Sequence, residues 1–107
     1  MLIRCNGSSE PLPGPVSIDE VCRLIGAATL DSVALFNLGD PLHVMLVDDA
    51  GYETQVVQVP EGVYLRPVRA RKPVNEKATV LYRANCAPGT KHAIVGDVVV
   101  VPDEDFV

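Results

Sequence analysis

The chain has 107 residues, enough for one domain with a modest hydrophobic core and no need of disulfide staples. Its formal net charge of −5 favours solubility and argues against a general nucleic-acid binder. Its apolar runs are far shorter than the ~18 residues of a membrane-spanning helix, so we expect no membrane partner.

The cysteines indicate the compartment. Cys5, Cys22 and Cys86 are widely spaced and odd in number, which fits reduced thiols better than a disulfide framework. The first seven residues contain no apolar stretch typical of a secretory signal. We therefore expect a cytoplasmic protein.

The first third of the chain predicts a hairpin and a helix. The Asn6-Gly7 pair is a strong tight-turn signal between short strands at 2–5 and 9–12. Ser17 and, three residues later, Glu20 form a capping box, and apolar residues recur after it at helical spacing. These signals predict a helix over about residues 17–28, which Gly26 weakens or ends.

The middle of the chain predicts strands separated by short turns. The strands are expected at residues 32–37, 42–47, 53–59 and 63–68, with turns at 39–41, 48–51 and 60–62. Because the turns are short, consecutive strands are expected to pair antiparallel.

The last third predicts a second helix and a buried strand. Asn75 is a good N-cap, and an apolar stripe at helical spacing follows it, so we expect a helix over about residues 75–86. Residues 98–101 are four consecutive valines, typical of a central strand covered on both sides, and Pro102 ends the run.

Together these elements predict a single α+β domain over residues 1–107. We expect an antiparallel sheet of about five to seven short strands with both helices on one face, which would bury both apolar stripes. A β-grasp-like fold is the alternative, because it also opens with two strands and a helix.

Four ordered motifs carry a resemblance to a known family. They are VSIDEVCRLIGA (16–27), LHVMLVDDAG (42–51), PVNEKATVLYRAN (73–85) and IVGDVVVVPDEDF (94–106). Together they resemble a small domain of unknown function found in phage, plasmid and integrated-element proteins. The resemblance implies a bacterial or phage setting and assigns no catalytic or binding residue. In the family pattern the second motif runs almost directly into the third, so residues 52–72 resemble an added hairpin.

The candidate binding residues form a basic stretch at the end of that hairpin. They are Arg66, Arg69, Arg71 and Lys72, with Lys77 shortly after them. Such a stretch fits three interpretations: a solvated edge strand blunted by charge, a dock for an acidic protein patch, or a holder of nucleic-acid or nucleotide phosphates.

Other residues are weaker candidates for a binding or catalytic site. The N-terminus of the second helix is an anion site in principle, but capping by Asn75 explains it more simply. Asp48-Asp49 is best explained as part of a turn. Cys86 and His92 have the residue types of a nucleophile and base, yet Cys86 follows a helix, where the dipole does not activate a thiol. No metal or cofactor motif is present.

The sequence therefore favours a non-enzymatic binding module of a phage or mobile element. Its predicted partner is a host or element-encoded protein, which it would inhibit or regulate. The alternative is a nucleic-acid or nucleotide binder that uses residues 66–72. One side of the 52–72 hairpin is apolar, so the sequence is also compatible with a homo-oligomer formed through that hairpin.

Overall fold

The computed structural model describes all residues from 1 to 107. The strands are β1 (Leu2–Ile3), β2 (Ser9–Glu10), β3 (Leu30–Leu35), β4 (His43–Asp48), β5 (Tyr52–Val59), β6 (Gly62–Ala70) and β7 (Val98–Pro102). The helices are α1 (Ile18–Ile25) and α2 (Glu76–Arg83), with short 3-10 turns η1 (Phe36–Leu38) and η2 (Asp103–Asp105). The α+β fold class predicted from the sequence is confirmed.

Five strands form the sheet of the body, in the order β2-β1-β7-β4-β3. Every neighbouring pair in it runs antiparallel. The valine-rich β7 lies at the centre, between β1 and β4, and its four valines are all buried. The central position expected for residues 98–101 is therefore confirmed.

The two helices cover opposite faces of this sheet, so the expectation that both lie on one face is wrong. Val21 and Ile25 of α1 pack with Leu46 and Val99, whereas Ala78 of α2 packs with the alternate strand positions, such as Met45, Val98 and Val100. Successive side chains of a strand point to opposite faces, so β7 needs a cover on each side. This arrangement also differs from a β-grasp, in which one helix packs across one face.

Local signals set the helix ends. The Ser17 hydroxyl accepts a hydrogen bond from the Glu20 N–H at 3.3 Å, and Gly26 ends α1 in a left-handed conformation with φ of 68°. Asn75 caps α2, which ends at Arg83. Both helices are thus a little shorter than expected, because their last predicted residues lie in turns.

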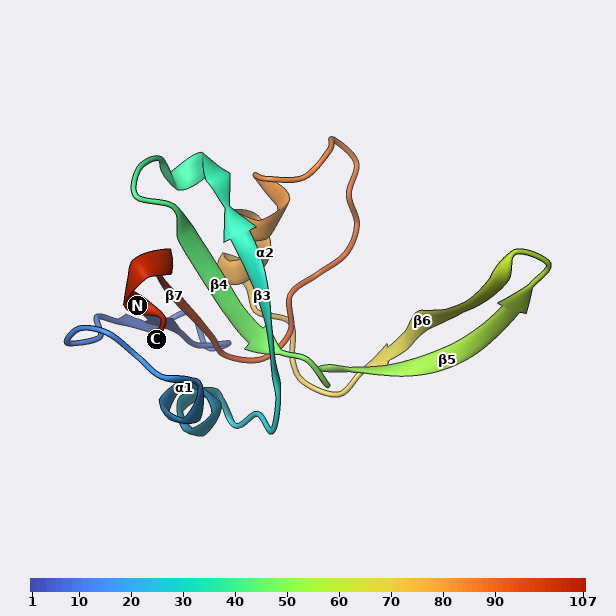
Figure 1. The fold of residues 1–107 in the computed structure, drawn as a ribbon, viewed down its shortest axis with the longest axis horizontal. Helices are drawn as coiled ribbons and strands as arrows, with labels where there is room; N and C mark the ends of the chain where they lie inside the picture. Colours follow the sequence, from blue (N-terminus) through green and yellow to red (C-terminus); the bar gives the residue numbers. More distant parts are fainter.

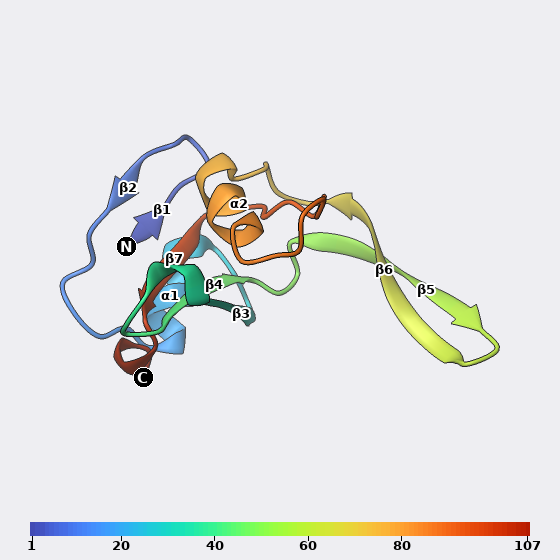
Figure 2. The same ribbon diagram turned by 90° about the horizontal axis from the view of Figure 1, so that it is seen from above.

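The predicted pairing of residues 42–47 with 53–59 is also wrong. Both edges of β4 are already occupied, by β3 and by β7. After the turn at 48–51 the chain therefore leaves the sheet, and β5 pairs only with β6 in a separate two-stranded ribbon. This ribbon projects from the body and makes the molecule elongated, with extents of 48 × 29 × 26 Å (Figures 1 and 2). No helix of the chain has the length and apolar character needed to span a bilayer.

Candidate functional site

The projecting ribbon, residues 52–70, is the most exposed part of the molecule, and we call it the arm. All nine residues of β6 are exposed, and in β5 only Tyr52 and Val57 are partly buried. Figure 1 shows the arm extending away from the body without covering from any other element. An isolated two-stranded ribbon is only marginally stable in water, so an uncovered arm is an unusual feature for a chain of this size.

The strand register assigns the arm two chemically different faces. Directly opposed residues of an antiparallel pair share a face, and alternate positions point to the other side. One face, the apolar face, carries Tyr52, Thr54, Val56, Gln58, Val63, Leu65, Pro67 and Ala70. None of these eight residues is charged.

Three side chains in the outer part of the apolar face are open to solvent. The exposed fractions are 64% for Val56, 61% for Val63 and 64% for Leu65. Burying a side chain of this size is worth about 1.5–3 kcal/mol relative to leaving it in water. The apolar face therefore offers a substantial gain in free energy to any surface that covers it.

The other face of the arm carries its charges. Arg66 donates a hydrogen bond from Nη2 to Oε1 of Gln55 at 2.8 Å. Arg69 is the register partner of Glu53, next to a β-bulge in the ribbon. Charged side chains on an exposed strand discourage nonspecific edge-to-edge pairing. On this face they alternate with Val57, Val59 and Tyr64.

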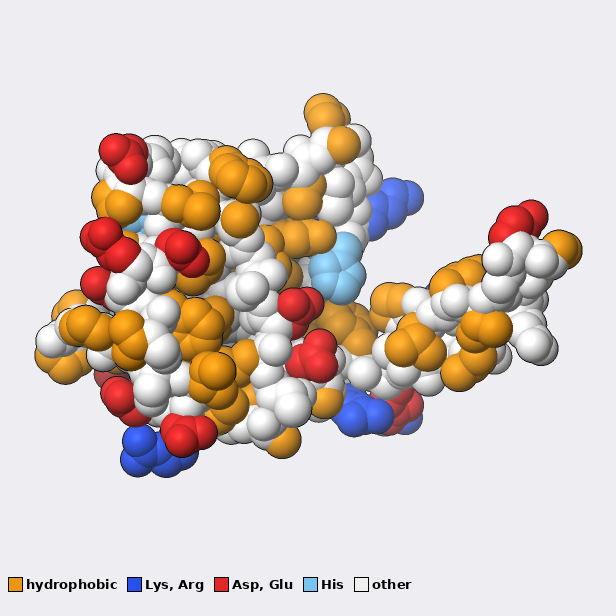
Figure 3. All heavy atoms as spheres, viewed as in Figure 1, with side chains coloured by type: hydrophobic (Ala, Val, Ile, Leu, Met, Phe, Trp, Pro, Cys, Tyr) orange, Lys and Arg blue, Asp and Glu red, His pale blue; other side chains and the backbone are white.

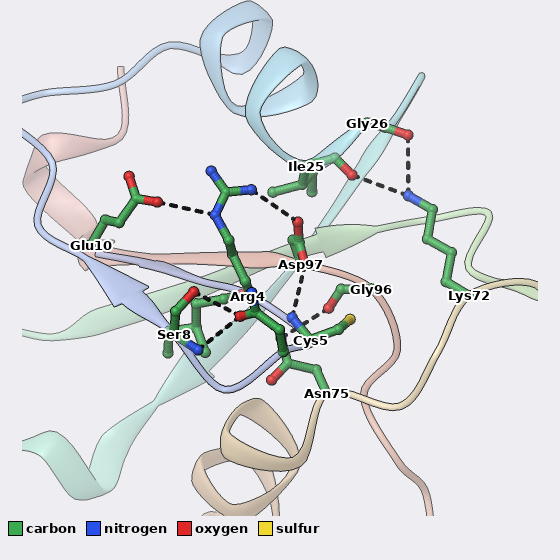
Figure 4. Close-up of polar contacts among 12 residues, drawn as sticks. Arg4, Cys5, Ser8, Glu10, Ile25, Gly26, Lys72, Asn75, Gly96 and Asp97 are labelled. Atoms are coloured by element: carbon green, nitrogen blue, oxygen red, sulfur yellow. Dashed lines mark hydrogen bonds and ion pairs between the residues drawn. The ribbon is translucent and has the colours of Figure 1, made fainter.

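Lys72 fixes the base of the arm to the body. Its Nζ lies 2.7 Å from Oδ2 of Asp48 and donates to the carbonyl oxygens of Ile25 and Gly26, each at 3.1 Å. Figure 4 shows the side chain reaching the C-terminal end of α1, where a positive charge is favourable. Burial raises the pKa of Asp48, but the bonds and charges at this contact outweigh burial, so its pKa lies below the ordinary value.

Close packing reinforces this anchor. The stem of Lys72 passes so near Gly96 that a Cβ on that residue would lie 2.8 Å from Lys72 Cδ. In the turn just before β5, a Cβ on Gly51 would lie 2.9 Å from a methyl group of Val95. The Arg71 N–H donates to the Gly51 carbonyl oxygen at 2.9 Å, which joins the two strands at the base. The direction of the arm is therefore set by the body.

A small hollow lies where the apolar face meets the body. Its volume is about 220 Å³, and its lining includes Tyr52, Asp31, Asp49 and His92. The Tyr52 hydroxyl donates to the Ala93 carbonyl oxygen, and burial raises the pKa of that tyrosine. The His92 ring packs against Tyr52, with ring centroids 5.2 Å apart. Sites for small molecules usually measure ~300–1,000 Å³, so this hollow is small for a substrate.

The basic residues predicted from the sequence divide into three groups. Arg66 and Arg69 lie on the arm, and Arg71 follows it; all three are exposed. Lys72 is committed to Asp48 and to α1. Lys77 belongs to α2 in the body, where it lines a shallow apolar groove with residues such as Met1 and Val80. The basic stretch is thus not one continuous patch.

Other sequence candidates have structural partners. Asn75 is fully buried, its Oδ1 accepts from the Ala78 N–H at 3.1 Å, and its Nδ2 donates to the carbonyl oxygens of Ile3 and Gly96, each at 3.0 Å. The Asn75 side chain therefore occupies the N-terminus of α2, and no open anion site remains there.

The cysteines and histidines are also placed away from catalytic geometry. The Cys86 thiol donates to the Tyr82 carbonyl oxygen at 3.2 Å rather than to His92. Burial and the nearby Asp97 carboxylate raise the pKa of the Cys5 thiol, so a smaller fraction of it is the nucleophilic thiolate at neutral pH. No three side chains of His, Cys, Asp or Glu gather closely enough to bind a metal ion.

Comparison of the chain with family models, with curated proteins and with solved structures gave no match.

Sequence reasoning identified the hairpin and its apolar side, but it missed the role of Lys72. It also missed an exposed apolar group in the loop between β3 and β4, formed by Phe36, Leu38 and Leu42. The available signal was three large apolar residues within a turn region that also contains Gly39-Asp40-Pro41, since such residues seldom cluster in a solvated loop.

Proposed function

We propose that the chain is a non-enzymatic binding module that recognises a protein through the apolar face of its arm. The observation that carries this proposal is the uncovered, uncharged face containing Val56, Val63 and Leu65. Soluble monomers seldom leave contiguous apolar surface open unless it serves an interaction. The resemblance to phage and mobile-element proteins suggests a host or element-encoded partner that the module inhibits or regulates.

The rigid base of the arm supports a binding role. Lys72 and the close packing at Gly96 hold the arm in one direction before any partner arrives. A preorganised element loses less conformational entropy on binding than a flexible one, so more of the contact energy appears as affinity.

An enzymatic role has less support. The hollow at the arm base is small, and a groove of about 500 Å³ beside α2 is lined by residues such as Ile3, Val80 and Leu81. Two further depressions, of about 410 Å³ and about 400 Å³, lie along opposite sides of α1 and contain no cysteine or histidine. None of the four brings a nucleophile, a base and an oxyanion donor together, as acyl-transfer and related chemistry requires.

Binding of nucleic acid or a nucleotide is the alternative proposal, and it draws on fewer residues than the sequence indicated. Lys72 already neutralises Asp48, and Lys77 lies in α2. Arg66, Arg69 and Arg71 remain, in a chain whose net charge is −5. If the chain binds nucleic acid or a nucleotide in this way, its affinity should fall steeply as salt is added. The affinity should also fall when these three arginines are replaced with alanine.

The proposal is tested by capture of a partner from a bacterial lysate with three forms of the full chain. These are the native chain, Val56→Ser combined with Leu65→Ser, and the control Val80→Ser. Val80 is a matched control because it is 68% exposed but lies on α2. A specific protein retained by the native chain and the control, but lost by the arm variant, supports the proposal. The proposal would be refuted if the arm variant captures the same protein as the native chain, or if no form of the chain captures a specific protein.

A further inference from the structure

The hollow at the arm base contains two carboxylates that have no basic partner in the chain. Asp31 and Asp49 both line it, and both residues are exposed. Oδ1 of Asp31 accepts a hydrogen bond from the Ser32 N–H at 2.9 Å. Neither carboxylate forms an ion pair with a lysine or arginine, and the nearby Lys72 is committed to Asp48. The hollow therefore presents two negative charges that no ion pair within the chain neutralises.

The sheet brings these two carboxylates to the same place. Asp31 is the register partner of Val47 in the pair of β3 with β4, and Asp49 follows Val47 by two residues. The Asp49 N–H donates to the Thr29 carbonyl oxygen at 3.1 Å, so the pairing continues past the end of β4. Residues two apart on a strand point to the same face. One cationic group in the hollow would therefore face both carboxylates.

Aromatic rings form another part of the wall. Tyr52 and His92 line the hollow, and their ring centroids lie 5.2 Å apart. The Tyr52 hydroxyl donates to the Ala93 carbonyl oxygen, and the His92 ring also packs edge-on against Tyr82. These contacts hold both rings in place. A guanidinium group stacks on aromatic rings and forms paired hydrogen bonds with carboxylates, whereas an ammonium group is a compact point charge. The wall therefore offers both kinds of contact that arginine makes.

The size and position of the hollow indicate the source of such a group. Its volume of about 220 Å³ suits one side chain better than a whole metabolite. Thr54 and Pro67 line the hollow and also belong to the apolar face, so the two surfaces are continuous. Figure 3 shows acidic side chains and a histidine where the arm leaves the body. A protein that covers the apolar face would bring its own side chains to this point.

We propose that the hollow at the arm base receives an arginine side chain of the protein that the arm binds. The guanidinium group would lie beside Asp31 and Asp49 and against the rings of Tyr52 and His92. This inference rests on the proposed function and deepens it, because it gives the partner a defined chemistry. The partner presents an apolar surface to the arm, with an arginine at the edge of that surface.

The test is an NMR titration of the full, isotopically labelled chain with N-acetyl-arginine amide at neutral pH. We expect the backbone signals around Tyr52 and His92 to shift, with a Kd on the order of 10 mM, because each exposed contact contributes little. The citrulline analogue has a similar shape without the charge, and N-acetyl-lysine amide has the charge without the planar group. Both should bind at least about threefold more weakly. The inference would be overturned if the arginine probe shifts no signal at the hollow, or if either analogue binds equally well.

Two double variants of equal net charge make the test specific. The hollow variant combines Asp31→Asn with Asp49→Asn. The control combines Asp103→Asn with Glu104→Gln in η2, on the side of the body away from the arm (Figure 1). All four positions are exposed, so both variants should fold. The hollow variant should bind the arginine probe about tenfold more weakly than the native chain, and the control should bind it equally well. Equal weakening in both variants would show that overall charge attracts the probe, which would overturn the inference.

Capture from lysate separates this inference from the proposed function. The hollow variant should retain less of the protein that the native chain captures. If the arm variant loses that protein but the hollow variant retains it in full, the proposed function stands and the arginine assignment is wrong. If the arginine probe binds the hollow but the arm substitutions leave capture unchanged, the proposed function fails, and the assignment of the arginine to the partner of the arm fails with it.

Discussion

Lys72 and Asp48 form a partly buried ion pair, with Nζ 2.7 Å from Oδ2, at the point where the arm meets the body. The Asp48 side chain is only 7% exposed. The same ammonium group also bonds the last carbonyl groups of α1. One side chain thus joins the end of β4, the end of α1 and the base of the arm.

Replacing Lys72 with Met should destabilise the protein by about 2 kcal/mol, since it leaves a nearly buried carboxylate with fewer partners while keeping the apolar stem. The free energy of unfolding from urea titration at neutral pH measures the effect. Lys77→Met is the matched control, because Lys77 is exposed and makes no ion pair. Equal stability of the two variants would show that the ion pair contributes nothing net.

The same pair predicts a specific dependence on pH. The pKa of Asp48 lies below its ordinary value of 3.8 in the folded protein. Its contribution is therefore fully present well above pH 3.8 and is lost as the pH falls through the lower folded pKa. The gap in unfolding free energy between the native chain and Asp48→Asn should be constant near neutrality and shrink below about pH 4. The exposed Asp49→Asn serves as control, and a gap independent of pH down to about 2.5 would contradict the prediction.

Features governed by neighbouring residues could be predicted from the sequence. Ser17 and Asn75 start their helices, and Gly26 ends α1, because a cap bonds backbone groups within one turn of itself. The four valines at 98–101 indicated burial on both sides for a similar reason, since their pattern contains no polar position.

Features governed by distant residues could not be predicted. Whether β5 joined β4 or left the sheet depended on β7 occupying the edge of β4, which no local pattern encodes. The charge of Lys72 suggested membership of a basic patch, because a sequence does not show which carboxylate a lysine will meet. The apolar face of the arm could be predicted from strand alternation, but the 74% exposure of Phe36 became clear only from the fold.

Gly96→Ala should destabilise the protein more than Gly89→Ala, by about 1 kcal/mol. Both glycines have positive φ, 78° and 88°, so the backbone strain of alanine is similar at the two sites. Only at Gly96 would the new Cβ meet another group, at 2.8 Å from Lys72 Cδ. Urea titration of the two single variants measures the difference.

A double-mutant cycle identifies the cause of that difference. Lys72→Ala removes the stem that the new methyl group would strike, so Gly96→Ala should cost less in that background, by about 1 kcal/mol. Additive effects of the two substitutions would show that the close approach to Lys72 is not the source of the strain.

Asn75→Ala should cost about 3 kcal/mol, against about 1 kcal/mol for Ser17→Ala. Both residues cap helices, but Asn75 is fully buried and its amide also donates to two carbonyl oxygens, those of Ile3 and Gly96. Removing the amide would leave those oxygens without that donor inside the protein, whereas water can replace the partly exposed Ser17 hydroxyl.

Asn75→Asp separates capping from this second role. The aspartate keeps an acceptor for the Ala78 N–H but replaces the two donated hydrogen bonds with a carboxylate oxygen facing two carbonyl oxygens. It should therefore destabilise the protein at least as much as Asn75→Ala, although aspartate is as good an N-cap as asparagine. Urea unfolding at neutral pH measures both variants. A stability close to that of the native chain would mean that Asn75 acts through capping alone, and that β1 and the turn at Gly96 are joined to α2 by other contacts.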